Sequence, residues 1–177
     1  MSQTLTAPRI TTERLVLRAP AMGDVDQIAT LADDFEIARM TTRMPHPYSR
    51  ADAEGFVART LTLDAAKEVA FAIEQPGEGL VGMLGLHAQP GLGPEIGYWI
   101  GRRYWGQGFA SESAQAVLGW AGAEWRRRVV VAGFFADNPA SGRVLERAGF
   151  LLTGEVQQRH SIARGQTAAT RMMVWLA

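Results

Sequence analysis

The residues best suited to chemistry form a short glycine-rich turn, Arg103-Tyr-Trp-Gly106-Gln-Gly108, between an expected strand and an expected helix. A strand, such a turn and a helix in this order direct several backbone N–H groups and the positive end of the helix dipole toward one point. Gly106 and Gly108 permit positive φ and close backbone approach, and Arg103 adds a fixed positive charge. The segment therefore predicts an anion-binding turn.

The spacing of the glycines excludes two common phosphate-binding loops. No Gly-Lys-Ser/Thr follows Gly108, as a Walker A loop requires, and the pattern is not the Gly-x-Gly-x-x-Gly of dinucleotide-binding folds. Taken alone, the turn is also compatible with a loop whose glycines serve packing only.

Other reactive groups are few. The chain has no cysteine, and no Ser-His-Asp order stands out, so a covalent acyl-enzyme is not indicated. Its three histidines, His46, His87 and His160, have no metal-ligand spacing, and His46 and His160 are expected in loops. We expect no metal. His87 is a candidate proton acceptor because its usual pKa is near neutral, although a solvated histidine at a strand end is the ordinary alternative.

Hydrophobic periodicity predicts the strands and helices in the first half of the chain. The alternation in Arg14-Leu-Val-Leu-Arg18 predicts a strand, and Asp24 can cap a helix that follows it. A second helix is expected from the capping residue Ser49 to about Leu63. Three strands at residues 69–74, 80–87 and 95–100 then predict an antiparallel meander.

The second half begins with the helix that follows the turn, from Gly108 to about Glu124. Residues 128–135 read as a central strand that is apolar on both faces. Asn138-Pro139 predicts the start of a short helix that Gly149 ends, and strands follow at 150–155 and 171–176, joined by a polar loop. The element order is β-α-α-β-β-β-α-β-α-β-β.

Composition narrows the class of protein. The length of 177 residues and the lack of repeats or linkers fit one domain spanning 1–177. Lysine and arginine (18) balance aspartate and glutamate (18), which argues against nucleic acid as a partner. Neither a leader at Met1 to Pro8 nor a membrane-spanning run is expected, which predicts a soluble, cytoplasmic protein.

The turn, with Phe-Ala and a helix after it, resembles the acetyl-CoA-binding motif of the GNAT superfamily of N-acetyltransferases. The resemblance covers nearly the whole chain. Four further blocks carry it in the same order: Thr12-Glu-Arg-Leu-Val-Leu-Arg18, Glu95-Ile-Gly-Tyr-Trp-Ile100, Asn138-Pro-Ala-Ser141 and Arg147-Ala-Gly-Phe150. Together they look like the branch of ribosomal-protein-alanine (RimJ/RimL-type) acetyltransferases.

This resemblance implies an α+β, three-layer fold, with a mixed, mostly antiparallel sheet of six to seven strands and about four helices. It also implies acetyl-CoA as cosubstrate. The implied donor-binding residues are Tyr98, Trp99 and Ile100 on a splayed strand, Arg103, Trp105, Gly106, Gln107, Gly108, Ala110 and Ser111 around the turn, and Asn138 near the pantetheine arm. Glu112 has to point away, because a carboxylate in the first turn of the helix would compete with a bound anion.

The resemblance also suggests how protons move during direct transfer to an amine. Ser141 stands where the family often has a tyrosine, so it is the candidate acid for the CoA thiolate, with an ordinary first-turn serine as the alternative. Glu95 begins the strand beside the donor and is the candidate base, with His87 as its rival. An exposed strand-end carboxylate is the alternative for Glu95.

The acceptor pocket of the family lies between the first helices and the late hairpin, here about residues 33–48 and 157–167. Asp33, Asp34 and Glu36 could attract a cationic amine there, although such a run is usually solvated. A protein N-terminus or a small-molecule amine would fit, and the chain could be a monomer or a homodimer. The alternative function is a non-catalytic acyl-CoA-binding or interaction domain of the same fold.

Overall fold

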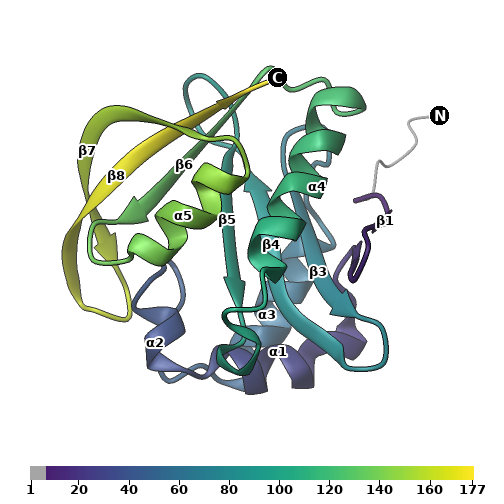
Figure 1. The fold of residues 1–177 in the computed structure, drawn as a ribbon. Helices are drawn as coiled ribbons and strands as arrows, with labels where there is room; N and C mark the ends of the chain where they lie inside the picture. Colours follow the sequence, from purple (N-terminus) through teal and green to yellow (C-terminus); the bar gives the residue numbers. More distant parts are fainter. Residues whose placement is uncertain (1–6) are drawn as a thin grey trace.

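The computed structural model describes residues 7–177 and contains one eight-stranded sheet with helices on both faces (Figure 1). Residues 1–6, part of the N-terminal segment in which no leader is expected, lie outside the described residues. The strand order is β1-β2-β3-β4-β5-β6-β8-β7, in which only β5 and β6 run parallel. The mixed, mostly antiparallel α+β sheet predicted above is confirmed, with β1 (Ile10–Thr11) as an additional edge strand.

The N-terminal elements form one edge of the sheet and one helical layer. They are β2 (Val16–Arg18), the 3-10 helix η1 (Met22–Asp24), α1 (Val25–Ala32), α2 (Phe35–Ala38) and α3 (Arg50–Thr60). Ser49 caps α3 by accepting from the Asp52 amide, as predicted. The side chain of Asp24 does not cap α1. It is buried and pairs with Arg18 instead, at 2.8 Å.

The central meander follows the prediction closely. It consists of β3 (Val69–Gln75), β4 (Gly79–His87) and β5 (Glu95–Ile100), paired antiparallel in sequence order. The short helix η2 (Arg102–Tyr104) and the turn then lead into α4 (Phe109–Ala123). The turn therefore lies between β5 and α4, where the glycine spacing placed it.

The C-terminal elements are β6 (Val129–Phe135), α5 (Pro139–Arg147), β7 (Leu151–Ser161) and β8 (Gln166–Leu176). The expected polar loop between the last two strands is wrong, because both strands extend into one long hairpin and His160 lies within β7. The polar side chains of this segment did not indicate a strand. The strands are held there by hydrogen bonds between the two backbones of the hairpin.

Two apolar clusters fix the layers. The larger packs α4 and α5 on the face of the sheet toward the viewer in Figure 1, with Phe71, Leu86 and Leu118 fully buried. The smaller packs α1 and α3 on the opposite face, around Ile28 and Val57. Both clusters meet β3 and β4, so these two strands are the rigid centre from which the functional elements extend.

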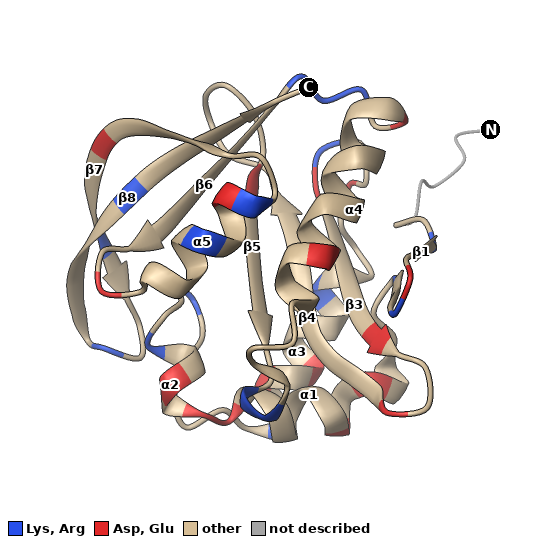
Figure 2. Ribbon diagram, in the orientation of Figure 1, with Lys and Arg blue, Asp and Glu red and all other residues tan. Residues whose placement is uncertain are grey.

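Charged side chains are distributed over all layers, and neither sign forms a continuous band in the view of Figure 2. Among the helices of residues 7–177, none combines the length and hydrophobicity that a membrane crossing requires.

Candidate functional site

The turn after β5 has the backbone conformation that its glycines predicted. Gly106 and Gly108 have φ of +76° and +81°, a region that other residues rarely adopt. A Cβ added at Gly106 would meet no atom within 4 Å, so the turn is open to solvent at this point. The indole N–H of Trp105 donates to the Ile100 carbonyl at 2.7 Å and ties the turn to the end of β5.

The backbone donors of the turn have no partner in the described part of the chain. Among residues 7–177, no carbonyl or side chain accepts from the N–H groups of residues 106–111, the last residues before the helical ladder begins at Glu112. Such donors at the start of a 15-residue helix favour an anion. The Arg103 guanidinium lies over the Tyr104 ring and donates to its hydroxyl at 2.6 Å.

Glu112, in the first turn of α4, points away from the donors of the turn, as predicted. Its carboxylate accepts from the Thr12 hydroxyl at 2.6 Å and from the Arg14 amide and guanidinium at 3.0 and 2.8 Å. Burial raises the pKa of Glu112, but these hydrogen bonds outweigh it and the pKa is lowered. The charge is therefore present at neutral pH and neutralised by Arg14.

Arg14 also holds the turn itself, which sequence reasoning missed. Its guanidinium donates to the Gln107 carbonyl at 2.9 Å and lies over the Phe109 ring at 4.9 Å. The two segments are more than 90 residues apart in the chain, so no local pattern indicates the contact. The only available signal was that Arg14 lies in one of the blocks shared with the family.

Beside the turn, β5 and β6 separate. They are paired at one position, Glu95 opposite Val131, and the Val131 amide donates to the Pro94 carbonyl at 2.9 Å. Beyond Glu95 the two strands diverge toward the turn, as Figure 1 shows. The edge of β5 that carries Tyr98, Trp99 and Ile100 is therefore not covered by a neighbouring strand. An extended group could add to it through main-chain hydrogen bonds.

A cavity of about 710 Å³ opens at the separation of the strands. It is lined by the predicted proton-transfer residues Glu95, His87 and Ser141, together with the side chains of Tyr98 and Trp99. The turn residues 103–111 are not part of its wall and lie beyond the other end of β5. The structure thus brings the acid–base candidates together in one cavity and keeps the anion-binding turn separate from them.

Ser141, on the first turn of α5, is paired with Tyr98. Their hydroxyl oxygens are 2.7 Å apart, and the Tyr98 hydroxyl lies 3.3 Å from the Ser141 carbonyl. Burial raises the pKa of Tyr98 to about 12, although the hydrogen bond to Ser141 acts in the opposite direction. Asn138 caps α5 by accepting from the Ser141 amide at 3.3 Å. The sequence had assigned Tyr98 a backbone role only.

His87 and Glu95 are cross-strand partners on β4 and β5, but their side chains differ in the partners that they contact. Glu95 is ion-paired with Arg159 of β7. The His87 ring lies over two glycines of the sheet, and a Cβ added at Gly85 would come within 2.8 Å of it. Burial lowers the pKa of His87, and the positive charge of Arg43 lowers it further, whereas Glu68 and Glu95 act in the opposite direction. The imidazole is therefore neutral at pH 7.

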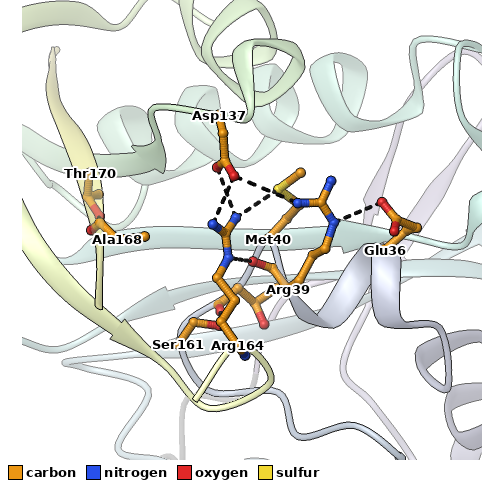
Figure 3. Close-up of polar contacts among 9 residues, drawn as sticks. Glu36, Arg39, Met40, Asp137, Ser161, Arg164, Ala168 and Thr170 are labelled. Atoms are coloured by element: carbon orange, nitrogen blue, oxygen red, sulfur yellow. Dashed lines mark hydrogen bonds and ion pairs between the residues drawn. The ribbon is translucent and has the colours of Figure 1, made fainter. Parts of the chain in front are cut away.

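The outer wall of the cavity is built by the loop between α2 and α3 and by the tip of the β7–β8 hairpin. The Ser161 hydroxyl donates to the Thr41 carbonyl at 2.9 Å, and the Ile162 amide donates to the Thr42 carbonyl at 3.1 Å. Figure 3 shows the Asp137 carboxylate joined to the guanidinium groups of both Arg39 and Arg164, and the Arg164 guanidinium contacts both of its oxygens at 2.9 Å.

The acidic residues expected to attract a cationic amine are engaged elsewhere. Asp33 accepts from the Tyr48 amide at 2.9 Å, Asp34 caps α2, and Glu36 pairs with Arg39 at 2.9 Å. None of the three lines the cavity.

Comparisons with known proteins agree with this geometry. Residues 14–151 match the family model described as "Acetyltransferase (GNAT) domain". The uncharacterized N-acetyltransferase YoaA of Bacillus subtilis is 30% identical over 155 residues, which are 85% of this chain and 87% of that protein.

Two solved structures share the fold. The ribosomal L7/L12 alpha-N-protein acetyltransferase RimL, in complex with coenzyme A, is 22% identical. Its TM-score is 0.83, over 96% of this chain and 98% of that chain. Spermidine N-acetyltransferase from Vibrio cholerae, in complex with CoA and spermine, is 20% identical with a TM-score of 0.76, over 93% of this chain and 96% of that chain.

Proposed function

This chain belongs to the GNAT acetyltransferase family of acetyl-CoA-dependent enzymes, and from that premise we propose that it transfers the acetyl group of acetyl-CoA directly to a primary amine held in the cavity. The observation that carries the proposal is the uncovered edge of β5. It leads from the open anion-binding turn into a cavity that runs along β5 and contains acid and base side chains.

The donor is proposed to lie along this edge. The backbone N–H groups of residues 106–111, with Ala110 and Ser111 among them, would hold the pyrophosphate, with Arg103, Trp105 and Gln107 around the turn. The backbone of Tyr98, Trp99 and Ile100 would bind the pantetheine arm as an added strand, and Asn138, at the start of α5, would lie near that arm. This arrangement would place the thioester at the cavity.

We propose His87 as the group that receives the proton of the attacking amine. The side chain is neutral at pH 7, lines the cavity and forms no hydrogen bond with residues 7–177. Glu95, the other candidate, is ion-paired with Arg159, so its carboxylate would have to leave that partner before accepting a proton. Glu95 would then act on His87 through its negative charge.

Ser141 is the proposed proton donor to the departing CoA sulfur, with the Tyr98 hydroxyl behind it. As the nitrogen–carbon bond forms and the carbon–sulfur bond breaks, the serine hydroxyl gives its proton to sulfur and regains one from Tyr98. Tyr98 then takes up a proton from solvent, and His87 releases to solvent the proton that it received from the amine. The raised pKa of Tyr98 keeps the phenol protonated over the working pH range. The phenol therefore carries its proton, and can donate a hydrogen bond to Ser141, at any pH where the amine is reactive.

The proposal is tested by acetyl-CoA binding, measured by calorimetry, and by CoA release with a panel of amines. Because the chain contains no cysteine, all free thiol in the release assay comes from CoA. A panel that covers peptide N-termini and polyamines reflects the acceptors of the structural neighbours. Binding with no release from any amine would support the non-catalytic alternative and overturn the proposed transfer.

A matched pair of variants locates the donor. Gly106→Asp and Gly106→Asn have side chains of the same shape, and asparagine and aspartate both tolerate positive φ. Only the aspartate places a negative charge beside a bound pyrophosphate. We expect Gly106→Asp to bind acetyl-CoA at least about tenfold more weakly than Gly106→Asn, because two like charges a few ångströms apart repel by more than about 1 kcal/mol. Equal affinities would contradict the placement of the pyrophosphate.

A further inference from the structure

The charged side chains that line the acceptor cavity fall into two groups. Glu95 and Arg159 neutralise each other as an ion pair. Asp52 is engaged in the cap of α3, where it accepts from the Ser49 amide and hydroxyl, both at 2.7 Å. Glu95 and Arg159 therefore cancel each other, whereas Asp52 keeps its negative charge while its side chain is held in the cap.

The second group has no such partners. Among residues 7–177, the guanidinium groups of Arg43 and Arg59 form no ion pair and donate no hydrogen bond. Arg43 lies on the loop between α2 and α3, and Arg59 lies in the last turn of α3. Glu68 is the remaining charge on the wall, and it accepts only from the Ala88 amide, at 3.4 Å.

The six charges on the wall, three arginines and three carboxylates, cancel in sum, but Arg43 and Arg59 are its two cations without a partner among the described residues. The charge of Arg43 reaches the reacting end of the cavity, since it lowers the pKa of His87. A polyamine carries no anionic group that these two guanidinium groups could bind. An amine that also carries an anionic group could place that group at the arginines and its nitrogen at His87.

We propose that Arg43 and Arg59 form an anion subsite of the acceptor cavity, and that the preferred acceptor is a primary amine bearing a carboxylate or phosphate group. The inference rests on the proposed transfer to an amine and names the chemical class of that amine. A guanidinium presents paired N–H donors that match either anion. Both side chains are exposed, so the attraction is moderate and weakens with salt.

The anionic group could belong to a small molecule or to the side chain that follows a peptide N-terminus. The test uses acceptors that differ from one another by one charge: glycine against glycinamide for the first source, and the tripeptide amides Ser-Asp-Ala, Ser-Asn-Ala and Ser-Lys-Ala for the second. Spermidine represents polycations. For each acceptor, kcat/KM is measured by CoA release, and affinity for the CoA-loaded protein is measured by calorimetry.

For wild type we expect an about tenfold preference for the anionic member of at least one pair, the combined effect of two exposed ion pairs. The acceptor pair that shows this preference identifies whether the anionic group belongs to a small molecule or to a peptide side chain. Arg43→Gln/Arg59→Gln should reduce the preference to about one, and Arg43→Lys/Arg59→Lys should retain part of it. Because the charge of Arg43 also lowers the pKa of His87, the readout is the ratio of kcat/KM between the members of a pair, in which a change at the base cancels. Salt should lower the wild-type preference only.

Arg171→Gln is the matched control, because Arg171 is exposed on β8 and does not line the cavity. The subsite is overturned if neutral acceptors or spermidine bind as well as anionic ones, or if the double glutamine variant weakens all acceptors equally. Charge-selective binding without CoA release from any acceptor would support the subsite and overturn the proposed transfer. Turnover without charge preference would support the proposed transfer and overturn the subsite.

Discussion

The donor turn follows the last residue of β5, whereas the acceptor cavity runs along β5 from Glu95 to Trp99, and the two are built in different ways. The turn is formed by consecutive residues between Ile100 and Glu112, and its two left-handed glycines set its shape. The cavity is assembled from segments far apart in the chain, such as Thr41 and Ser161, which are 120 residues apart. The first region is therefore encoded locally, and the second depends on tertiary contacts.

The two regions also differ in how charge is handled. The carboxylate beside the turn, Glu112, is neutralised by Arg14, so the turn presents only donors. The cavity contains both a closed ion pair and charges without partners. A shared cosubstrate requires the first arrangement, whereas the second can vary with the acceptor. Each of the following experiments perturbs one of the two regions.

The largest effect is expected at His87. Replacing it by glutamine keeps a polar side chain but removes the proton acceptor, and kcat is expected to fall about 100-fold, the lower end of general-base contributions. The affinity for acetyl-CoA should not change. Steady-state kinetics and calorimetry on the same variant measure both quantities. Glu95→Gln, next to it on the sheet, should reduce kcat much less if His87 is the base.

The pH profile separates a base from a structural residue. Because the pKa of His87 is lowered, the imidazole stays neutral from high pH down to a pH below 6.5 and is protonated only under more acidic conditions. Wild-type kcat should fall on that acidic side, and His87→Gln should lack this decline with the same acceptor. A decline that persists in His87→Gln and disappears in Glu95→Gln would reverse the assignment.

A smaller effect is expected from the hydroxyl pair. Tyr98→Phe and Ser141→Ala should each lower kcat by about tenfold, because a thiolate is a fair leaving group and needs less than the usual general-acid contribution. Since the two hydroxyls act in series, the double variant should be no slower than the slower single variant. Stopped-flow measurement of CoA release tests this, and additive losses would show that the hydroxyls act independently.

Sequence reasoning succeeded where structure is local. The meander, the turn and the cap of α5 at Asn138 follow from periodicity, glycine spacing and capping chemistry. It failed where the partner is distant. Nothing near Tyr98 indicates that Ser141 lies 2.7 Å away, and nothing near Glu95 indicates Arg159. The polar residues around His160 likewise gave no sign that the hairpin continues through them.

Arg14 tests the donor region alone. Arg14→Gln should leave Glu112 negatively charged near the turn and release the Gln107 carbonyl, and we expect KM for acetyl-CoA to rise about tenfold, the scale of one lost charge-assisted contact. KM for acetyl-pantetheine, which lacks the pyrophosphate, should stay unchanged. If both donors lose affinity equally, Arg14 acts through folding rather than through the turn.

Adding Glu112→Gln to Arg14→Gln separates charge from structure. The double variant removes the uncompensated carboxylate, so acetyl-CoA affinity should recover in part, while the contact to Gln107 stays lost. No recovery would mean that the brace on the turn, and not the neutralisation of Glu112, is the contribution of Arg14.

The smallest effect is expected at the hairpin tip, on the acceptor side. Arg164 is largely buried and joins Asp137 and the Arg39 carbonyl (Figure 3). Its guanidinium also lies over the Phe135 ring. Arg164→Gln should lower the free energy of unfolding by about 1–2 kcal/mol and loosen the outer wall of the cavity. The acceptor KM should then rise a few-fold, while acetyl-CoA affinity stays at the wild-type value, because the turn is built without this contact.

Asp137→Asn removes the same ion pair from its more exposed member and is the matched control. Hydrogen bonding to Arg164 lowers the pKa of Asp137, so the pair persists from neutral pH down to below the usual carboxyl value of 3.8 and is lost only in stronger acid. Both variants should therefore behave alike at pH 7, with the smaller loss of stability for Asp137→Asn. Urea unfolding and acceptor kinetics measure the two effects. A parallel loss of acetyl-CoA affinity would contradict the independence of the two regions, since it would couple the hairpin to the turn at the far end of β5.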